Sequence, residues 1–223
     1  MKIAKDLNFN INEIFFSIQG EGTRAGRACT FVRLQGCLLR CVWCDTPYAL
    51  ERKEVHNLMS GEDIFNEINK YPTKFLMLTG GEPLEQDDIF DFIKIACEKG
   101  FEVVIETNGQ VLTDKVDKRA VKILDIKCPD SKMEKKNNYK NLELLNPHDE
   151  LKFVIASRRD FDFAIKLCDE NKLYDKVSAV LFSPVFEGPK LQEFSNWVMD
   201  SGKPIRMQLQ LHKYIWSPQT RGV

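Results

Sequence analysis

Seven apolar runs of strand length recur along this chain of 223 residues, and segments with helical spacing separate most of them. A continuous apolar run is typical of a strand buried on both faces, and alternating strands and helices indicate parallel β/α units with right-handed crossovers. The pattern predicts an α/β fold with six to seven such units. The expected strands are residues 30–34, 75–78, 101–105, 121–126, 151–155, 177–182 and 205–211.

Helices are expected between these strands. Ser60 and Asp63 resemble a capping box at the start of one helix, and a second helix, residues 87–99, is expected to end at Gly100. Helical spacing also covers residues 158–171 and 189–201. Because the chain has no room for eight helices, we expect an incomplete, TIM-like barrel whose lateral opening admits a larger ligand. Residues 1–223 are expected to form one domain.

The least ordinary residues stand at or just after the ends of the expected strands. In β/α barrels the loops at the carboxyl edge carry the active site, so these segments are expected to meet at one mouth. They are residues 36–46, 79–83, 106–109, 127–129, 183–184 and 210–213. The polar stretch 128–141 interrupts the strand and helix rhythm and is expected to be either a solvated loop or a lid over the site.

The charge balance narrows the class of partner. With 32 basic and 33 acidic residues the formal net charge is -1, so no field of one sign indicates nucleic acid or an anionic membrane, and a small-molecule substrate is favoured. The first residues lack an apolar signal core, and no stretch approaches the ~20 apolar residues of a membrane span. A cytoplasmic protein is therefore expected.

Three cysteines within eight residues, Cys37, Cys41 and Cys44, indicate a metal centre. A structural zinc site usually has four closed ligands, whereas an iron–sulfur cluster held by three thiolates leaves one iron open for another ligand. The alternative is that these residues share one helical face and are simply buried, although Pro47 would break such a helix soon afterwards. The other four cysteines are scattered, so a disulfide framework is not expected.

A second motif, Thr79-Gly80-Gly81-Glu82-Pro83, follows an apolar run. The two glycines remove Cβ atoms where a ligand can press against the strand end, and Glu82 offers a carboxylate that can accept from an ammonium group. An ordinary turn before proline is the alternative.

Together, the cysteine run and the Gly-Gly-Glu-Pro motif resemble the radical S-adenosylmethionine superfamily over nearly the whole chain. The resemblance implies a [4Fe-4S] cluster on Cys37, Cys41 and Cys44, with the open iron chelating the methionine moiety of S-adenosylmethionine. Reduction of the cluster would cleave the sulfonium and give a radical that abstracts hydrogen from substrate. The implied cofactor-binding residues are Trp43, Gly81, Glu82, Asp125, Ile126, Lys127, Phe182, Ser183, Pro184 and Val185.

Within the superfamily, the segments 17–22, 31–34, 44–46 and 210–214 resemble the 7-carboxy-7-deazaguanine synthase family. That resemblance implies conversion of 6-carboxy-5,6,7,8-tetrahydropterin to 7-carboxy-7-deazaguanine with loss of ammonia, in queuosine and 7-deazapurine biosynthesis. It also implies Mg²⁺ at Thr46, an electron donor such as flavodoxin or ferredoxin, and a homodimer. The implied substrate-binding residues are Ile18, Gln19, Gly20, Glu21, Arg33, Thr79, His212 and Val223.

The residues themselves leave alternatives to these implied roles. Arg33 can give a pterin carboxylate a bidentate partner, or it can merely pair with Asp45 or Glu21. Thr46 can cap the turn before Pro47 instead of binding a cation. The segment 125–127 reads Asp-Ile-Lys where many members of the family have Ser-Pro-Lys, which departs from the implied cofactor contact.

Two other functions stay open on the sequence. A glycyl-radical activating enzyme has similar cluster spacing but acts on a protein substrate. A zinc-binding structural or interaction module would complete its site with Cys29 or a histidine.

Overall fold

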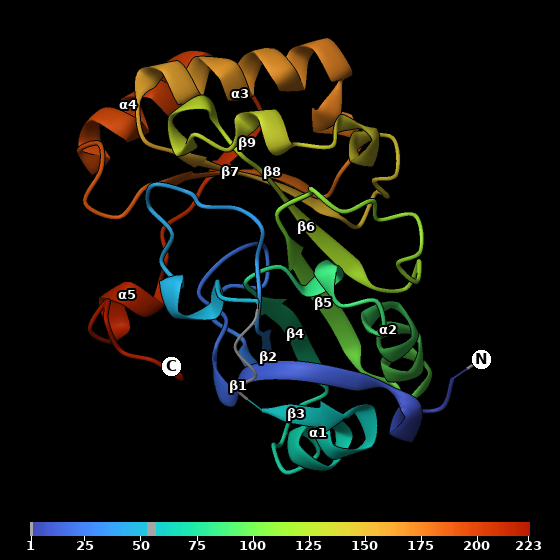
Figure 1. The fold of residues 1–223 in the computed structure, drawn as a ribbon. Coiled ribbons are helices and arrows are strands. Elements are labelled where there is room, and N and C mark those ends of the chain that lie inside the picture. Colours follow the sequence, from blue (N-terminus) through green and yellow to red (C-terminus); the bar gives the residue numbers. More distant parts are fainter. Residues whose placement is uncertain (1, 53–56) are drawn as a thin grey trace.

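The structure, a computed structural model, describes residues 2–52 and 57–223. Within these residues one curved sheet has nine strands in the order β3-β1-β2-β4-β5-β6-β7-β8-β9 (Figure 1). The strands are β1 (Asn8–Ile18), β2 (Ala28–Leu34), β3 (Leu58–Ser60), β4 (Phe75–Gly80), β5 (Glu102–Thr107), β6 (Val121–Ile126), β7 (Glu150–Ile155), β8 (Ala179–Pro184) and β9 (Ile205–Met207).

The parallel part of the sheet confirms the α/β fold predicted from the apolar runs. From β2 through β4 to β9, each strand is parallel to the next strand in the sheet. The sheet is open, with β3 and β9 at its edges, and it does not close into a barrel. Strand β1 pairs antiparallel with both β2 and β3; neither β1 nor β3 was expected, because polar residues interrupt the apolar pattern of residues 8–18.

The predicted strand at residues 205–211 is wrong in its extent, since β9 ends at Met207. Residues after it are drawn away from the sheet by contacts with the turn between β1 and β2: the backbone N–H of Leu211 donates to the carbonyl of Gly20 at 3.0 Å. The residues after Met207 therefore leave the sheet because the carbonyl of Gly20 is a competing hydrogen-bond acceptor.

The helices are α1 (Gly61–Ile68), α2 (Ile89–Glu98), α3 (Arg158–Asn171), α4 (Leu191–Ser201) and α5 (His212–Ile215). The capping box at the start of α1 is confirmed, because Ser60 Oγ accepts from Asp63 N and Asp63 Oδ2 accepts from Ser60 N, each at 3.1 Å. The stretch 128–141 contains three short 3-10 helices, η4 (Pro129–Ser131), η5 (Glu134–Lys136) and η6 (Tyr139–Leu142). Buried Ser131 and Asn141 attach it to the core. In the described part of the chain, no helix is long and apolar enough to cross a bilayer.

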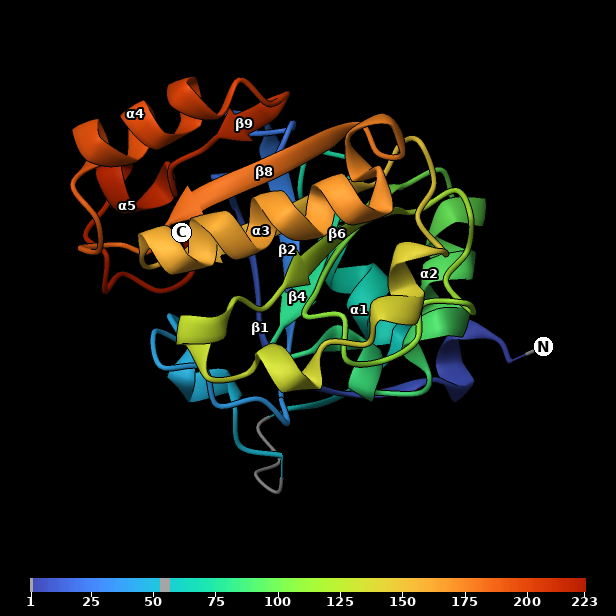
Figure 2. The same cartoon turned by 90° about the horizontal axis from the view of Figure 1, so that it is seen from above.

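Helices α1 to α4 cover the outer side of the curved sheet (Figure 1), and Figure 2 shows α3 running alongside β8. Alternate residues of each strand face opposite sides. Leu76 and Leu78 of β4 belong to the core cluster that includes α1 and α2, whereas Phe75 and Met77 belong to a smaller cluster on the inner side. A second outer core cluster joins β6, β7 and β8 to α3 and α4.

The same alternation places polar residues on the inner side of five neighbouring strands, near the carboxyl ends of four of them and in the middle of β7. They are Arg33 (β2), Thr79 (β4), Glu106 (β5), Asp125 (β6) and Lys152 (β7). Arg33 lies opposite Thr79 in the register, and Asp125 lies opposite Lys152. Most of the outward positions next to them hold apolar core residues, so strand alternation brings these five polar side chains to the inner side of the sheet.

Candidate active site

A pocket of about 300 Å³ lies at the carboxyl ends of the strands. Its lining comes from inward-facing strand residues, from the loop that carries the three cysteines and from the last residues of the chain. Helix α5 and the C-terminus lie on the open side of the sheet (Figure 1). As predicted from the strand ends, segments far apart in the sequence meet at this edge.

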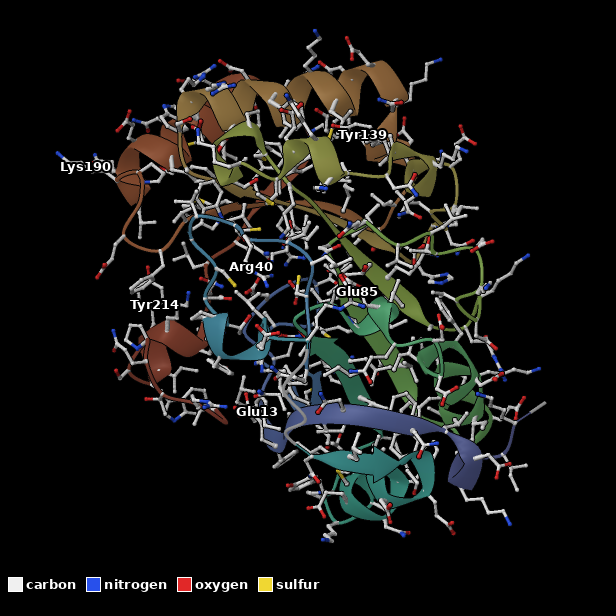
Figure 3. All side chains as sticks on the ribbon, viewed as in Figure 1. Glu13, Arg40, Glu85, Tyr139, Lys190 and Tyr214 are labelled. Carbon is white, nitrogen blue, oxygen red and sulfur yellow. The ribbon has the colours of Figure 1, made fainter. Side chains whose placement is uncertain are left out.

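The cysteine loop, residues 36–46, is fixed at its first residues. Gly36 begins it with φ at 107°, a conformation that favours glycine. The carbonyl of Gly36 accepts from the backbone N–H of Glu82 at 2.8 Å. Glu85, labelled in Figure 3, accepts from the backbone N–H of Leu38 at 2.9 Å. No residue of this loop is α-helical, so the interpretation of the cysteines as one buried helical face is wrong.

All three cysteines of the loop line the pocket. Cys37 is buried, and its Sγ accepts from the backbone N–H of Leu39 at 3.4 Å and from Asn108 Nδ2 at 3.5 Å. Burial raises the pKa of the Cys37 thiol to about 11 and also raises the pKa of Cys41. Thiolates at these positions therefore need a positively charged centre, which iron supplies.

The three sulfurs of the loop are the donor type that an iron–sulfur cluster takes. Within residues 2–52 and 57–223, no three Cys, His, Asp or Glu side chains converge so as to hold one ion. Cys29, the candidate fourth zinc ligand, packs with Phe75 and Met77 in the inner core cluster and does not line the pocket.

The Gly-Gly-Glu-Pro motif supports the cysteine loop from behind. A Cβ on Gly81 would lie 2.2 Å from the carbonyl oxygen of Gly36, so only glycine allows β4 to approach the loop this closely. Glu82 is fully buried and does not line the pocket. Its carboxylate accepts from Leu84 N at 3.0 Å, from Thr107 Oγ1 at 2.8 Å and from Asn108 N at 2.6 Å. The Glu82 carboxylate was expected to accept from the ammonium group of a ligand. These donors, which belong to the protein itself, occupy it instead.

Arg33 faces the pocket from β2. Its Nε donates to Glu13 Oε1 at 2.7 Å, so its partner is Glu13 rather than Asp45 or Glu21. The centres of the Phe15 and Tyr48 rings lie 5.8 and 5.9 Å, respectively, from the guanidinium carbon of Arg33. This carboxylate and these rings fix the plane of the guanidinium at the pocket wall.

The turn between β1 and β2 closes the pocket on the side of β9. Gln210 Nε2 donates to Glu21 Oε1 at 2.9 Å. A Cβ on Gly20 would lie 2.3 Å from His212 Nδ1, so Gly20 leaves the space in which the imidazole lies. Burial lowers the pKa of His212, so the ring stays neutral over a wider pH range than an exposed histidine.

The C-terminal segment also folds over the pocket, with Pro218 and residues 220–223 among its lining. The guanidinium carbon of Arg221 lies 3.8 Å from the centre of the Tyr48 ring, and Arg221 Nη2 donates to Asn12 Oδ1 at 3.1 Å. Val223 is therefore next to the residues of β1 and β2 that face the pocket. The polar composition of this tail gave no reason from periodicity to expect such packing.

The expected binding residues divide into two groups. Those that line the pocket are Ile18, Gln19, Gly20, Glu21, Arg33, Trp43, Thr46, Thr79, Gly81, Asp125, Lys127, Val185, His212 and Val223. Those outside its lining are Glu82, Ile126, Phe182, Ser183 and Pro184. Ile126 and Phe182 face outward into the core, as strand alternation requires.

Asp125 carries an acceptor that fits a ligand. Its Oδ2 accepts from Lys127 Nζ at 2.8 Å, but its Oδ1 is buried and has no hydrogen-bond partner among the residues that the structure describes. A buried acceptor without a donor is costly. A hydroxyl or ammonium donor of a bound cofactor would satisfy it, so the Asp-Ile-Lys segment fits a polar cofactor beside the cysteine loop.

Glu106 and Lys152 are among the charged residues that line the pocket without having been expected to bind a ligand. Lys152 contacts both Glu21 and Glu106, the latter at 2.5 Å. The sequence contains a signal for both, since each is a charged residue at an alternate position of an otherwise apolar strand. Such a residue must face a polar interior, because burying it among apolar groups is expensive.

Comparisons with known proteins place the chain in a family. A family model described as the radical SAM superfamily matches residues 31–170. The 7-carboxy-7-deazaguanine synthase of Koribacter versatilis is 40% identical over 229 residues, which cover 96% of this chain and 99% of that protein. The enzyme of the same name from Chlorobaculum tepidum is 40% identical over 224 residues, covering 99% and 100%.

The chain belongs to the 7-carboxy-7-deazaguanine synthase family of the radical SAM superfamily. Solved structures agree on the fold. QueE from Escherichia coli has a TM-score of 0.76 at 24% identity, over 92% of this chain and 95% of that one. Streptococcus suis SuiB bound to its precursor peptide has a TM-score of 0.57 at 18% identity, over 78% and 46%. Membership of the 7-carboxy-7-deazaguanine synthase family confirms the resemblance drawn from the motifs.

Proposed function

We propose that this protein converts 6-carboxy-5,6,7,8-tetrahydropterin to 7-carboxy-7-deazaguanine with loss of ammonia, a step of queuosine and 7-deazapurine biosynthesis. The observation that carries the proposal is one pocket with a three-cysteine loop on one side and Arg33, Gln19 and Glu21 on the other. The first side suits a radical-generating cofactor, and the second suits a carboxylated heterocycle.

Cys37, Cys41 and Cys44 would hold a [4Fe-4S] cluster, and its open iron would take the amino and carboxylate groups of S-adenosylmethionine. When bound, this pair supplies one-electron cleavage and an organic radical that abstracts hydrogen. Trp43, Gly81, Asp125, Lys127 and Val185 line the pocket beside the loop. The other expected cofactor-binding residues would act from behind this lining, by packing against it and holding its backbone in place. They are Glu82, Ile126, Phe182, Ser183 and Pro184.

The substrate would lie between the two sides. Arg33 keeps its Nε on Glu13 and would direct its terminal nitrogens to the substrate carboxylate, as a bidentate partner. Gln19 and Glu21 would read the amide and amino edge of the pterin. The remaining substrate contacts would come from Ile18, Gly20, Thr79, His212 and Val223. A neutral His212 would donate or accept a hydrogen bond without adding charge.

Mg²⁺ is proposed at Thr46. The Thr46 hydroxyl lines the pocket two residues after Cys44, with its oxygen 3.9 Å from Cys44 Sγ. A single protein oxygen suits Mg²⁺, which usually keeps several waters and shares its remaining positions with substrate.

Several broader expectations stay predictions. They are the flavodoxin or ferredoxin donor, the homodimer, the cytoplasmic location and the action of residues 1–223 as one domain. The small pocket, narrowed by the C-terminal segment, favours a small molecule over the protein substrate that a glycyl-radical activating enzyme needs.

Anaerobic reconstitution tests the proposal. The protein loaded with iron and sulfide would be mixed with S-adenosylmethionine, dithionite, Mg²⁺ and 6-carboxy-5,6,7,8-tetrahydropterin. We expect 7-carboxy-7-deazaguanine by mass spectrometry and ammonia in equal amount. A protein with a full cluster that cleaves S-adenosylmethionine yet releases neither product would exclude this function.

A further inference from the structure

Lys152 lies in the wall of the pocket although only 4% of it is exposed. It stands at an inward position of β7, between Leu151 and Phe153, which face the outer core. Its ammonium contacts the carboxylates of Glu21 and Glu106. These two residues come from different parts of the chain, the turn between β1 and β2 and the strand β5, so Lys152 is the point at which they are joined.

A buried lysine is costly unless its charge is paired and its donors are used. Here Glu21, Glu106 and Asp125 face it, and Lys127 pairs with Asp125. Without the ammonium, the carboxylates of Glu21 and Glu106 would repel each other across a partly dehydrated pocket. They would then separate or take up a proton, and either change would alter the pocket wall.

Lys152 leaves acceptor capacity on both carboxylates, because an ionised carboxylate has about four lone-pair sites and the internal donors on Glu21 do not fill them all. Glu21 Oε1 accepts from Gln210 Nε2, and the side chain of Glu106 remains 27% exposed although it belongs to the pocket lining. Burial opposes the ionisation of both groups. Lys152 outweighs this effect for Glu21 and lowers its pKa, whereas burial dominates for Glu106 and raises its pKa.

We propose that Lys152 is a positioning residue that holds Glu21 and Glu106 together as one paired acceptor for the N–H donor edge of a heterocyclic substrate. The amide N–H and the amino group of a pterin lie side by side, like the donors of a guanidine, and a carboxylate accepts such a pair in its own plane. This inference rests on the proposed function, because it assigns that substrate edge to this wall.

The chain contains a matched control. Lys122, at an early position of β6, is another buried lysine with a short ion pair, its Nζ lying 2.8 Å from Asp149 Oδ2 with 5% of its side chain exposed. Lys122 does not line the pocket. A purely structural role for buried lysine pairs would make the two positions equivalent for ligand binding.

The test measures binding of 6-carboxypterin, a redox-stable analogue, by calorimetry to the cluster-loaded protein with S-adenosylmethionine present. We expect Lys152→Met to weaken binding at least about tenfold, the scale of one lost charged hydrogen bond. In turnover, KM for the substrate should rise by more than kcat falls. Lys152→Arg, which keeps the charge, should recover part of the affinity, and Lys122→Met should keep affinity within about twofold despite a lower Tm.

Affinity of Lys152→Met within twofold of the unaltered protein would overturn the inference. If Lys152→Met does not fold, Glu106→Gln/Lys152→Met removes one charge of each sign and is compared with Glu106→Gln alone. Equal affinity of those two variants would likewise overturn it, because Glu21 would then be held without Lys152. Failure of the proposed function looks different, since the unaltered protein would itself neither bind 6-carboxypterin nor form the deazapurine.

Discussion

The side-chain amide of Asn108 donates to the sulfur of Cys37, with Nδ2 3.5 Å from Sγ. Asn108 comes from the end of β5, and its backbone N–H is held by the buried carboxylate of Glu82 at 2.6 Å. The Gly-Gly-Glu-Pro motif thus reaches the cysteine loop through a third segment. A hydrogen bond to a ligating sulfur stabilises the more negative, reduced state of a cluster.

Removing this donor should make the cluster harder to reduce. For Asn108→Ala and Asn108→Asp we expect the midpoint potential to fall by roughly 20 to 60 mV, the equivalent of one net hydrogen bond in a one-electron couple. The aspartate keeps the oxygen that accepts from Gln110 N, so it controls for loss of that turn contact. A redox titration followed by electron paramagnetic resonance measures the potential, and unchanged potentials in both variants would contradict the prediction.

Arg33→Lys should cost affinity only for ligands that carry the carboxylate. A lysine can still pair with Glu13 but lacks the planar fork that binds a carboxylate with two parallel hydrogen bonds. We expect binding of 6-carboxypterin to weaken by about 10- to 100-fold and binding of unsubstituted pterin by less than about threefold. Equal losses for the two ligands, measured by calorimetry, would show that Arg33 does not contact the carboxylate.

Cys44→Ala should abolish the cluster while leaving the fold intact. Cys44 is only partly buried and lies in the loop, so its loss leaves no cavity in the core. Cys168→Ala is the control, because Cys168 lies in α3 and is fully buried in the outer core. We expect iron, acid-labile sulfide and absorbance near 400 nm to disappear only in Cys44→Ala, and Tm to fall mainly in Cys168→Ala. Full iron and sulfide in Cys44→Ala would remove that cysteine from the ligand set.

The free energy of unfolding should fall as the pH rises through the mildly acidic range, because Glu82 loses its proton there. Burial raises the pKa of this carboxyl from 4.5 to about 7. Between these two pH values the folded state holds a proton that the unfolded state has released. The contribution of Glu82 to the free energy of unfolding is therefore fully present below about pH 4.5 and is lost as the pH rises through about 7. Glu82→Gln cannot titrate. Relative to this variant, the unaltered protein should lose about 2 to 3 kcal/mol between pH 5 and 8 by urea denaturation; parallel pH profiles would argue against it.

Much of the fold follows from local pattern. The seven parallel strands were recognisable because strands buried on both faces are apolar throughout, and α3 was predicted with the bounds that it has, Arg158–Asn171. Strand β1 was missed because it lies next to the edge of the sheet, where alternate residues are polar. The short extent of β9 also could not be foreseen, since it depends on contacts between Gly20 and Leu211 that are remote in sequence.

The sequence by itself determined the chemistry of one half of the site: three cysteines in a loop, followed one strand later by glycines that let the loop pack closely. These features are short-range patterns in the sequence, so they can be recognised without knowledge of the fold. Only the tertiary structure decided that Glu82 is a buried support, that Arg33 pairs with Glu13 and that Lys152 joins Glu21 to Glu106. Each of these depends on which strands are neighbours and which face is inward, and long-range pairing of that kind is set by burial across the whole sheet.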